Sequence, residues 1–193
     1  MDVDGTAAPF RRLDESLIHR SHAWEVTRST FEGPGGERFE RDVVRTRGAV
    51  SVVPILDRPD GPYVVLVRQF RHSVLAETIE IPAGMRDVAG EDPLGTARRE
   101  LAEEAGFAAK HYELLTMFHP SAGLTDATHH LFLATGLTPV PRDLQGPEEA
   151  LMTVLEVPFA EAVEMVESGR LTAANTVIGL LLAERRLGLR PAR

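Results

Sequence analysis

The chain has 193 residues, of which 43% are hydrophobic and 26% are charged, a composition typical of soluble globular proteins and not of disordered ones. Its 21 Lys and Arg residues stand against 29 Asp and Glu residues, and the resulting net charge of −8 argues against non-specific binding to nucleic acid. The chain has no cysteine, which excludes disulfide bonds and thiolate sites, and no apolar run approaches the roughly 20 residues that span a bilayer. We therefore expect a cytoplasmic protein with neither nucleic acid nor membrane as a partner.

The first 46 residues carry the signals of a small N-terminal β-hairpin. Two extended stretches, at 16–31 and 39–46, flank Glu32-Gly33-Pro34-Gly35-Gly36, whose glycines suit a tight reversal of the chain. Two strands alone bury too little apolar surface to be stable. A second copy of the chain would cover the apolar side chains of this region, which are Phe10, Leu13, Leu17, Ile18, Trp24, Val26 and Phe31. We expect a dimerisation arm at 1–46 and a homodimer, the alternative being a monomer whose hairpin folds back on its own domain.

The remaining residues, 47–193, carry the mixed signals of one α/β domain. Strands are predicted at 49–56 and 63–70, on either side of a turn-rich loop, and Pro54 predicts an edge or a bulge in the first of them. Further short strands are expected at 77–81, 112–118, 129–134 and 152–157. Helical segments separate and follow these strands, so the pattern indicates an α/β sandwich.

Three helices are predicted in this domain. The first opens with Asp92 as its N-cap and Pro93 at the first helical position, and it ends at Gly106, the residue type favoured just past a helix C-terminus. The second covers about 158–167 and the third about 173–187. The first helix is the one that carries candidate functional residues.

Three glutamates of the first helix lie beside its apolar stripe, which consists of Leu94, Ala97, Leu101 and Ala105. At about 100° per residue, Glu100 and Glu104 are about 40° apart, and Glu103 lies next to them. Like charges at this spacing destabilise a helix by about a few tenths of a kcal/mol per pair, so the arrangement calls for a cation. Hard divalent ions such as Mg²⁺ and Mn²⁺ take such oxygen ligands. The alternative is an ion pair between Arg99 and Glu103 on an otherwise solvated acidic face.

The residues around this helix form a longer pattern. Ile81-Pro82-Ala83-Gly84 precedes a glycine-containing loop and Glu91, and Arg99-Glu100-Leu101-Ala102-Glu103-Glu104-Ala105-Gly106-Phe107 follows eight residues later. The whole resembles the Nudix box, the loop–helix–loop motif of hydrolases that cleave nucleoside diphosphates linked to another group. One departure is that six residues, Met85 to Gly90, separate Gly84 from Glu91 where the usual pattern has five. The resemblance implies a Nudix-type α/β/α sandwich with a mixed sheet and an N-terminal β-hairpin arm.

The resemblance also implies a Mg²⁺-dependent enzyme in which Mn²⁺ can substitute. Metal ions that bridge substrate oxygens to helix carboxylates neutralise the charge that grows as water attacks phosphorus. The implied metal ligands are the carboxylates of Glu100, Glu103 and Glu104 and the backbone carbonyl of Ala83. Arg99 is expected to steady the glutamates.

The segment Glu80-Ile81-Pro82-Ala83-Gly84 resembles the branch of this family that hydrolyses ADP-ribose and nucleoside diphosphate sugars. In Val67-Arg68-Gln69-Phe70-Arg71, which is similar to a phosphate-holding segment of that branch, Arg71 is the expected clamp because an arginine fork matches two phosphate oxygens. The alternative for Arg68 and Arg71 is ordinary solubility at a strand edge. Met85, directly after Gly84, is also expected to bind substrate.

The same resemblance extends to the arm. In this branch the N-terminal arms exchange between the protomers of a dimer, which would carry Arg41, in Arg41-Asp42-Val43-Val44, to the substrate of the partner. An aromatic residue of the arm stacks on the adenine ring there, and Trp24 is the candidate. The alternative for Trp24 is that its indole only covers the sheet.

Two loops complete the resemblance. Pro120-Ser121-Ala122-Gly123-Leu124-Thr125-Asp126 is similar to a family loop, but Ala122 replaces a proline, and Ala127 stands where many ADP-ribose enzymes have a glutamate. His129 and His130 follow, and on a strand they would point to opposite sides, in structural or base-contacting roles. The general base of this branch is a glutamate of a mobile loop, for which Glu148 and Glu149 are the candidates, the alternative being a solvated turn.

We therefore expect a pyrophosphohydrolase that cleaves the diphosphate link of ADP-ribose or a related nucleoside diphosphate sugar into a nucleoside monophosphate and a sugar phosphate. The alternative is a catalytically silent regulatory module of the same fold that binds a nucleotide sugar. A diphosphate isomerase is a weaker alternative, because the thiol nucleophile that such chemistry often uses is absent.

Overall fold

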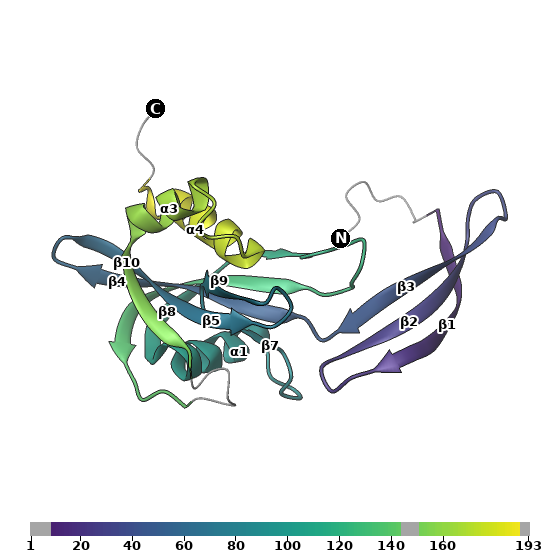
Figure 1. The fold of residues 1–193 in the computed structure, drawn as a ribbon, viewed down its shortest axis with the longest axis horizontal. Coiled ribbons are helices and arrows are strands. Elements are labelled where there is room, and N and C mark those ends of the chain that lie inside the picture. Colours follow the sequence, from purple (N-terminus) through teal and green to yellow (C-terminus); the bar gives the residue numbers. More distant parts are fainter. Residues whose placement is uncertain (1–8, 144–150, 190–193) are drawn as a thin grey trace. The chain divides into compact units, whose positions relative to one another are not determined.

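The computed structural model describes residues 9–143 and 151–189, and the chain forms two units (Figure 1). The first unit contains the chain up to Arg47 and the loop 121–127, and the second contains 48–120 and 128–193. Within the described residues, the first unit is an all-β arm and the second carries all the helices.

The arm is a three-stranded antiparallel sheet and not the predicted hairpin. Its strands, in the order β1-β2-β3, are β1 (Arg11–Arg20), β2 (Trp24–Glu32) and β3 (Arg38–Thr46). The predicted stretch at 16–31 is therefore divided, and the chain reverses at Ser21, whose N–H donates to the carbonyl oxygen of Trp24 at 2.8 Å. This reversal has neither glycine nor proline, and β1 is an edge strand whose side chains are almost all exposed. Neither the turn nor the first strand leaves a clear pattern in the sequence.

The loop 121–127 is held at the end of β3 by Asp126. The N–H of Thr46 donates to Oδ1 of Asp126 at 3.1 Å, and Arg45 donates to its Oδ2 at 3.2 Å. Arg45 also forms an ion pair with Glu15 of β1. The acidic residue of this loop therefore has a structural role inside the arm.

The second unit is built on a seven-stranded mixed sheet. Hydrogen-bonded neighbours follow the order β10-β5-β4-β9-β8, while β6 pairs with β5 and β7 pairs with β4. β4 and β9 are parallel, and the other pairs are antiparallel. All six predicted strands are present, and β7 is an additional one. The bounds are β4 (Ala49–Arg58), β5 (Gly61–Arg71), β6 (Ala76–Glu80), β7 (Ala83–Met85), β8 (Phe107–Phe118), β9 (His129–Pro139) and β10 (Thr153–Pro158).

Helices cover both faces of this sheet, which confirms the predicted α/β sandwich. Figure 1 shows α1 (Pro93–Glu100) on one face and α3 (Phe159–Glu167) with α4 (Ala174–Leu187) on the other. Along β4, Val50 and Val52 belong to the buried cluster on the α1 side, whereas Val53 belongs to the cluster on the α3 and α4 side. Both faces of β4 are buried, which explains why its sequence is a nearly continuous apolar run.

Pro54 lies where β4 changes its neighbour. The N–H of Ala49 donates to Thr128 on the β9 side, and the N–H of Val52 donates to the carbonyl oxygen of Pro82 on the opposite side. Because successive backbone groups of a strand alternate in direction, the nitrogen of Pro54 faces the same side as that of Val52. On that side the neighbour of β4 changes from β7 to β5, so the missing N–H falls between two pairings.

The three predicted helices are present at their predicted positions. Oδ1 of Asp92 accepts a hydrogen bond from the N–H of Gly95 at 2.6 Å and caps α1, and Gly106 ends this helical segment with a φ of 73°. The last turn, η1 (Leu101–Ala105), is π-helical, which the sequence did not predict. Among the described residues, no helix is both long and apolar enough to cross a membrane.

Candidate active site

The three glutamates of the predicted metal site lie at the end of α1 and in η1. Glu100 and Glu104 are only 8% and 5% exposed, and Glu103 is half-buried. Ala97 and Leu101 are fully buried and fix this helical segment against the sheet. The alternative of a solvated acidic face is therefore wrong for Glu100 and Glu104. Carboxylates buried this far are normally paired or bound to a cation.

Glu103 and Glu104 lie in the π-helical turn. The N–H of Gly106 donates to the carbonyl oxygen of Ala102 at 3.1 Å and also reaches that of Leu101, which gives a wider turn than an α-helix has. Such turns are rare and are frequently found at functional sites. Oε2 of Glu104 accepts a hydrogen bond from the N–H of Ala83 at 2.8 Å. Ala83, whose carbonyl oxygen is a predicted metal ligand, is thus in direct contact with Glu104, a predicted carboxylate ligand.

Gly84 allows β7 to lie directly against Glu100. A Cβ atom on Gly84 would be 1.9 Å from Cδ and 2.0 Å from Oε1 of Glu100, so any side chain there would displace the carboxylate. The glycine is required by this close approach. The longer loop between Gly84 and Glu91 therefore does not separate the glycine from the helix.

Arg99 joins the acidic residues of the loop to those of the helix. Its Nη1 lies 2.8 Å from Oε1 of Glu100 and 3.0 Å from Oε2 of Glu103. Its Nη2 lies 3.3 Å from Glu91 and 3.4 Å from Asp87. Burial opposes the charge of Arg99, but these acidic neighbours outweigh it and raise the pKa of the guanidinium. The ion pair with Glu103 is present, as one part of a larger network.

The donor set fits a hard divalent cation. Burial raises the pKa of Glu100 to about 7, although the charge of Arg99 opposes the shift, and a cation would favour the ionised carboxylate. Glu100, Glu104 and the carbonyl oxygen of Ala83 are the oxygen donors that Mg²⁺ and Mn²⁺ prefer. Within the described residues, no three acidic or imidazole side chains surround one point. Glu100 and Glu103 instead form ion pairs with Arg99.

A cavity of about 320 Å³ opens beside these carboxylates and is called here the catalytic cavity. Arg71 lines it and donates from Nε and Nη2 to the two carboxylate oxygens of Glu80, at 2.9 and 2.7 Å. Although burial opposes ionisation, the hydrogen bonds from Arg71 and Thr78 lower the pKa of Glu80, so its charge holds the guanidinium in place. The predicted residues along this cavity are Arg71, Ala83, Met85, Arg99, Glu100, Glu103 and Glu104. Their individual roles stay predictions.

The other candidate residues belong to other parts of the chain. Arg41 and Trp24 are in the arm, where the guanidinium of Arg41 lies 4.8 Å from the centre of the Phe39 ring and Trp24 is 41% exposed. The candidate general bases, Glu148 and Glu149, lie outside the described residues. The predicted contacts of these four residues with substrate stay predictions.

His129 and His130, at the start of β9, point to opposite faces of the sheet, as the alternation of a strand requires. Nε2 of His129 lies 2.6 Å from Oγ of Ser51, and Nδ2 of Asn175 donates to the same oxygen at 2.8 Å. Sequence reasoning missed Ser51 and Asn175. The available signal was Ser51 itself, the one polar residue in the apolar run 49–56, whereas Asn175 gave none.

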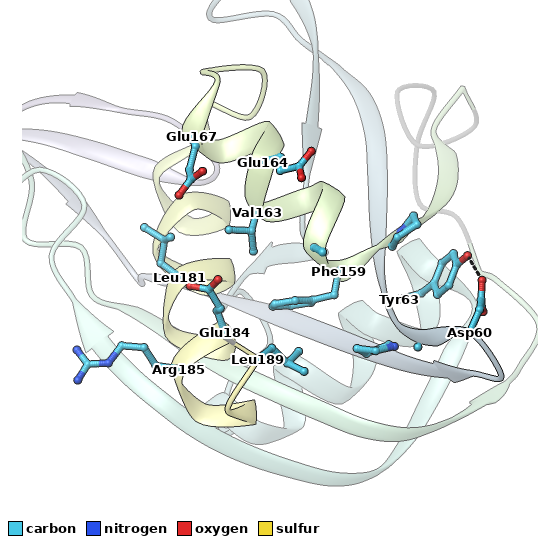
Figure 2. A pocket seen from close by; sticks show the side chains of 14 residues that line it. Asp60, Tyr63, Phe159, Val163, Glu164, Glu167, Leu181, Glu184, Arg185 and Leu189 are labelled. Atoms are coloured by element: carbon cyan, nitrogen blue, oxygen red, sulfur yellow. Dashed lines mark hydrogen bonds between the residues drawn. The ribbon is translucent and has the colours of Figure 1, made fainter. Parts of the chain in front are cut away.

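The largest of the cavities described lies elsewhere, between α3, α4 and the turn that joins β4 to β5 (Figure 2). Its volume is about 720 Å³, and Phe159, Val163 and Leu181 contribute apolar wall. Arg185 is the one basic residue among its described lining residues, whereas the acidic ones are Asp60, Glu164, Glu167 and Glu184. This acidic cavity would repel a diphosphate, so size alone does not identify the site.

Comparisons with known proteins agree with this geometry. A family model described as the NUDIX domain matches residues 45–175. The chain is 36% identical over 172 residues to the ADP-ribose pyrophosphatase of Mycobacterium tuberculosis, covering 89% of this chain and 82% of that protein. It is 36% identical over 149 residues to the ADP-ribose pyrophosphatase of Bacillus subtilis, covering 77% of this chain and 78% of that protein.

A third relative acts on a different nucleotide. The CMP-5'-(N-acetyl-N-hydroxy-3-aminopropyl)phosphonate hydrolase of Streptomyces rubellomurinus is 34% identical over 184 residues, covering 93% of this chain and 82% of that protein. Among solved structures, that of an ADP compounds hydrolase has a TM-score of 0.81 at 24% identity and covers 95% of this chain and 96% of that chain. At that identity the structural similarity is evidence for the fold alone.

Proposed function

Since the chain belongs to the Nudix family, we propose that it is a pyrophosphohydrolase that cleaves the diphosphate link of ADP-ribose or a related nucleoside diphosphate sugar. The products would be a nucleoside monophosphate and a sugar phosphate. The observation that carries the proposal is the catalytic cavity, along which Arg71, the box glutamates and Ala83 lie together. Such a cavity offers cationic and metal-binding groups to one diphosphate.

The metal site of the proposed enzyme consists of oxygen donors. Glu100, Glu103 and Glu104 and the carbonyl oxygen of Ala83 would hold Mg²⁺, with Mn²⁺ able to substitute. When bound, the ion would neutralise charge on the diphosphate and orient the attacking water. Arg99 keeps the ligands close together before the ion binds, because it neutralises part of their mutual repulsion.

Arg71 is the proposed diphosphate clamp. Glu80 fixes its guanidinium through two hydrogen bonds, which leaves less side-chain freedom to lose when the phosphate binds. The general base is proposed to be Glu148 or Glu149. Exchange of each for glutamine should reduce kcat in one variant with KM almost intact, and leave the other nearly unchanged. Two unchanged variants would place the base elsewhere in the chain.

The substrate class can be tested with purified protein and Mg²⁺. The panel is ADP-ribose, ADP-glucose, GDP-mannose, FAD and NADH, and the measurement is release of a nucleoside monophosphate. We expect the fastest release from ADP-ribose and none in the presence of a chelator. Binding of a nucleotide sugar without metal-dependent product would instead identify the silent regulatory module.

The arm is proposed to join two chains in a homodimer with exchanged N-terminal strands. Phe10, Leu17 and Ile18 are about half exposed and Trp24 is 41% exposed, so the arm has apolar surface to bury. Sedimentation should give about twice the monomer mass of 21.2 kDa. Deletion of residues 1–46 should give a poorly soluble or inactive monomer, and a soluble variant of full activity would reject the shared dimer site.

The compartment is proposed to be the cytoplasm, on the sequence grounds given above.

A further inference from the structure

A second, smaller cavity adjoins the catalytic cavity and is called here the side cavity. Its volume is about 290 Å³, and it shares Arg71, Ala83, Gly84 and Met85 with the catalytic cavity. Its other walls come from β4, β6, β8 with the residues just after it, β9 and the first turn of α4, and they include Glu80, Phe118, His129 and Asn175. A ligand whose diphosphate lies against Arg71 can therefore extend into the side cavity without leaving the protein surface.

The wall of the side cavity holds a histidine whose tautomer is fixed by a chain of hydrogen bonds. Nδ2 of Asn175 is a donor and takes an acceptor position of Ser51 Oγ, at 2.8 Å. Ser51 is fully buried, and its hydroxyl has no other acceptor among the described residues, so its proton points at Nε2 of His129, at 2.6 Å. Nε2 is therefore the acceptor, and the neutral imidazole carries its proton on Nδ1.

The orientation of this imidazole is fixed as well. Its ring is stacked on that of Phe118, with centroids 5.0 Å apart and an angle of 14° between the planes. Burial lowers the pKa of His129 to about 4, and His130 adds to the shift, so the ring is neutral near neutral pH. Among the described residues, Nδ1 has no hydrogen-bond partner. The ring thus brings one oriented donor to the wall of the side cavity.

The size and lining of the side cavity suit a sugar ring. Pockets for larger ligands range from about 300 to 1,000 Å³, and this one is at the lower end, which suits one ring with its substituents and not a whole nucleoside. Ala49, Met85, Phe118 and Pro120 supply apolar wall for the C–H groups of such a ring. The donor of His129 is matched by hydroxyl or ring oxygens, which every sugar carries.

We propose that the side cavity binds the non-nucleoside sugar of the substrate, and that His129 Nδ1–H donates a hydrogen bond to an oxygen of that sugar. This inference rests on the proposed function, because it takes the diphosphate to lie in the catalytic cavity. Ser51 does not line the side cavity, and Asn175, which does, has its Nδ2 engaged with Ser51. They are positioning residues that keep the donor of His129 directed at the sugar.

Binding of the two reaction products separates the sugar from the nucleoside. The intact protein is titrated with ribose 5-phosphate and, separately, with AMP, while the imidazole signals of His129 are followed by NMR. Comparison with the His129→Phe spectrum assigns those signals. We expect ribose 5-phosphate to shift them and AMP to leave them in place. A shift with AMP alone, or no shift with either, would overturn the proposal.

Kinetics of two variants test the role of the donor. His129→Phe keeps the ring stack and removes the donor, so KM for ADP-ribose and the inhibition constant of ribose 5-phosphate should both rise about 3- to 10-fold, the usual effect of one lost hydrogen bond. The inhibition constant of AMP and kcat should change less than about twofold. His111→Phe, at an exposed histidine of β8, is the matched control. Equal rises in the inhibition constants of AMP and ribose 5-phosphate would contradict the assignment of the side cavity to the sugar.

Asn175→Asp tests the hydrogen-bond chain itself. Aspartate accepts from Ser51, so Ser51 would accept from Nε2–H, and Nδ1 would lose its proton. The NMR signals should report the other tautomer, and ribose 5-phosphate should bind at least about 3-fold more weakly. Unchanged binding would reject the positioning role. If the protein hydrolyses no nucleotide sugar but ribose 5-phosphate still shifts His129, the hydrolase is rejected and the sugar site stands.

Discussion

The catalytic cavity and the largest cavity both carry several carboxylates, and they differ in how those carboxylates are held. Around the largest cavity, Glu164 and Glu167 are exposed on α3, where water screens their charge. In the catalytic cavity, Glu100 and Glu104 are buried, and Arg99 and the N–H of Ala83 contact them. A site that keeps charge away from water at a cost in stability is the better candidate for chemistry, although its volume is less than half as large.

The largest expected effect concerns Glu104. Glu104→Gln keeps the size of the side chain and its acceptor for the Ala83 N–H, but removes the charge that is proposed to hold the metal. We expect kcat at saturating Mg²⁺ to fall at least about 100-fold, with little change in the melting temperature. Glu164→Gln, at the edge of the largest cavity, is the control and should change kcat less than twofold. Equal effects of the two substitutions would remove the distinction between the cavities.

A second test uses the close approach of β7 and the helix. Gly84→Ala would place a methyl group within 1.9 Å of Cδ of Glu100, so the carboxylate must move. A displacement of about 1 Å in an active site can cost about 100-fold in rate, and the overpacking should reduce stability by about 1–3 kcal/mol. Gly123→Ala has open space around the new methyl group and serves as the control. A fully active Gly84→Ala variant would mean that the position of Glu100 is not critical.

The contrast between the cavities also shows what sequence can predict. The first helix, with its cap at Asp92, its end at Gly106 and its buried stripe, was predicted because each signal is local. The π-helical turn was not, since no local signal marks it, and the contact of Glu104 with β7 forms only in the folded chain. Likewise, Ser51 and Asn175 are 124 positions apart, and no local pattern joins them. Only the tertiary structure brings such pairs together.

The arm shows where a strand cannot be located from its sequence. The end of its second strand and both ends of its third were located within one residue, because glycines mark the turn between them. β1 was merged with β2 because an exposed edge strand has no buried face and therefore no alternation to detect. The predicted exchange of arms concerns a second chain and still requires the sedimentation measurement.

A smaller effect is expected at Arg71. Arg71→Lys keeps the charge and loses the planar fork that pairs with Glu80. We expect KM for ADP-ribose to rise about 10-fold, because the clamp on the phosphates is weaker and less well oriented. The control is Arg68→Lys, an exposed arginine three residues earlier on β5. If both variants raise KM equally, general positive charge is enough and the fork has no special role.

A further effect is expected on stability without metal, where no rate is measured. The pKa of Glu100 is raised from 4.5 to about 7 in the folded chain, so the folded state binds this proton more tightly than the unfolded state does. The stabilisation is complete below pH about 4.5 and is lost as the pH rises through 7, by about 3 kcal/mol at most. Denaturant unfolding with a chelator at pH 5 and pH 8 measures this loss. Glu100→Gln should reduce the difference between the two pH values, and an unchanged difference would assign it to other groups.

The most direct test of the account is the position of the metal. Crystals grown with Mn²⁺ give an anomalous signal that locates the ion without reference to activity. We predict a peak bounded by the carboxylates of Glu100 and Glu104 and the carbonyl oxygen of Ala83, with Glu100 turned away from Arg99. A peak among Glu164, Glu167 and Glu184 at the largest cavity, with none beside η1, would contradict the assignment of the active site.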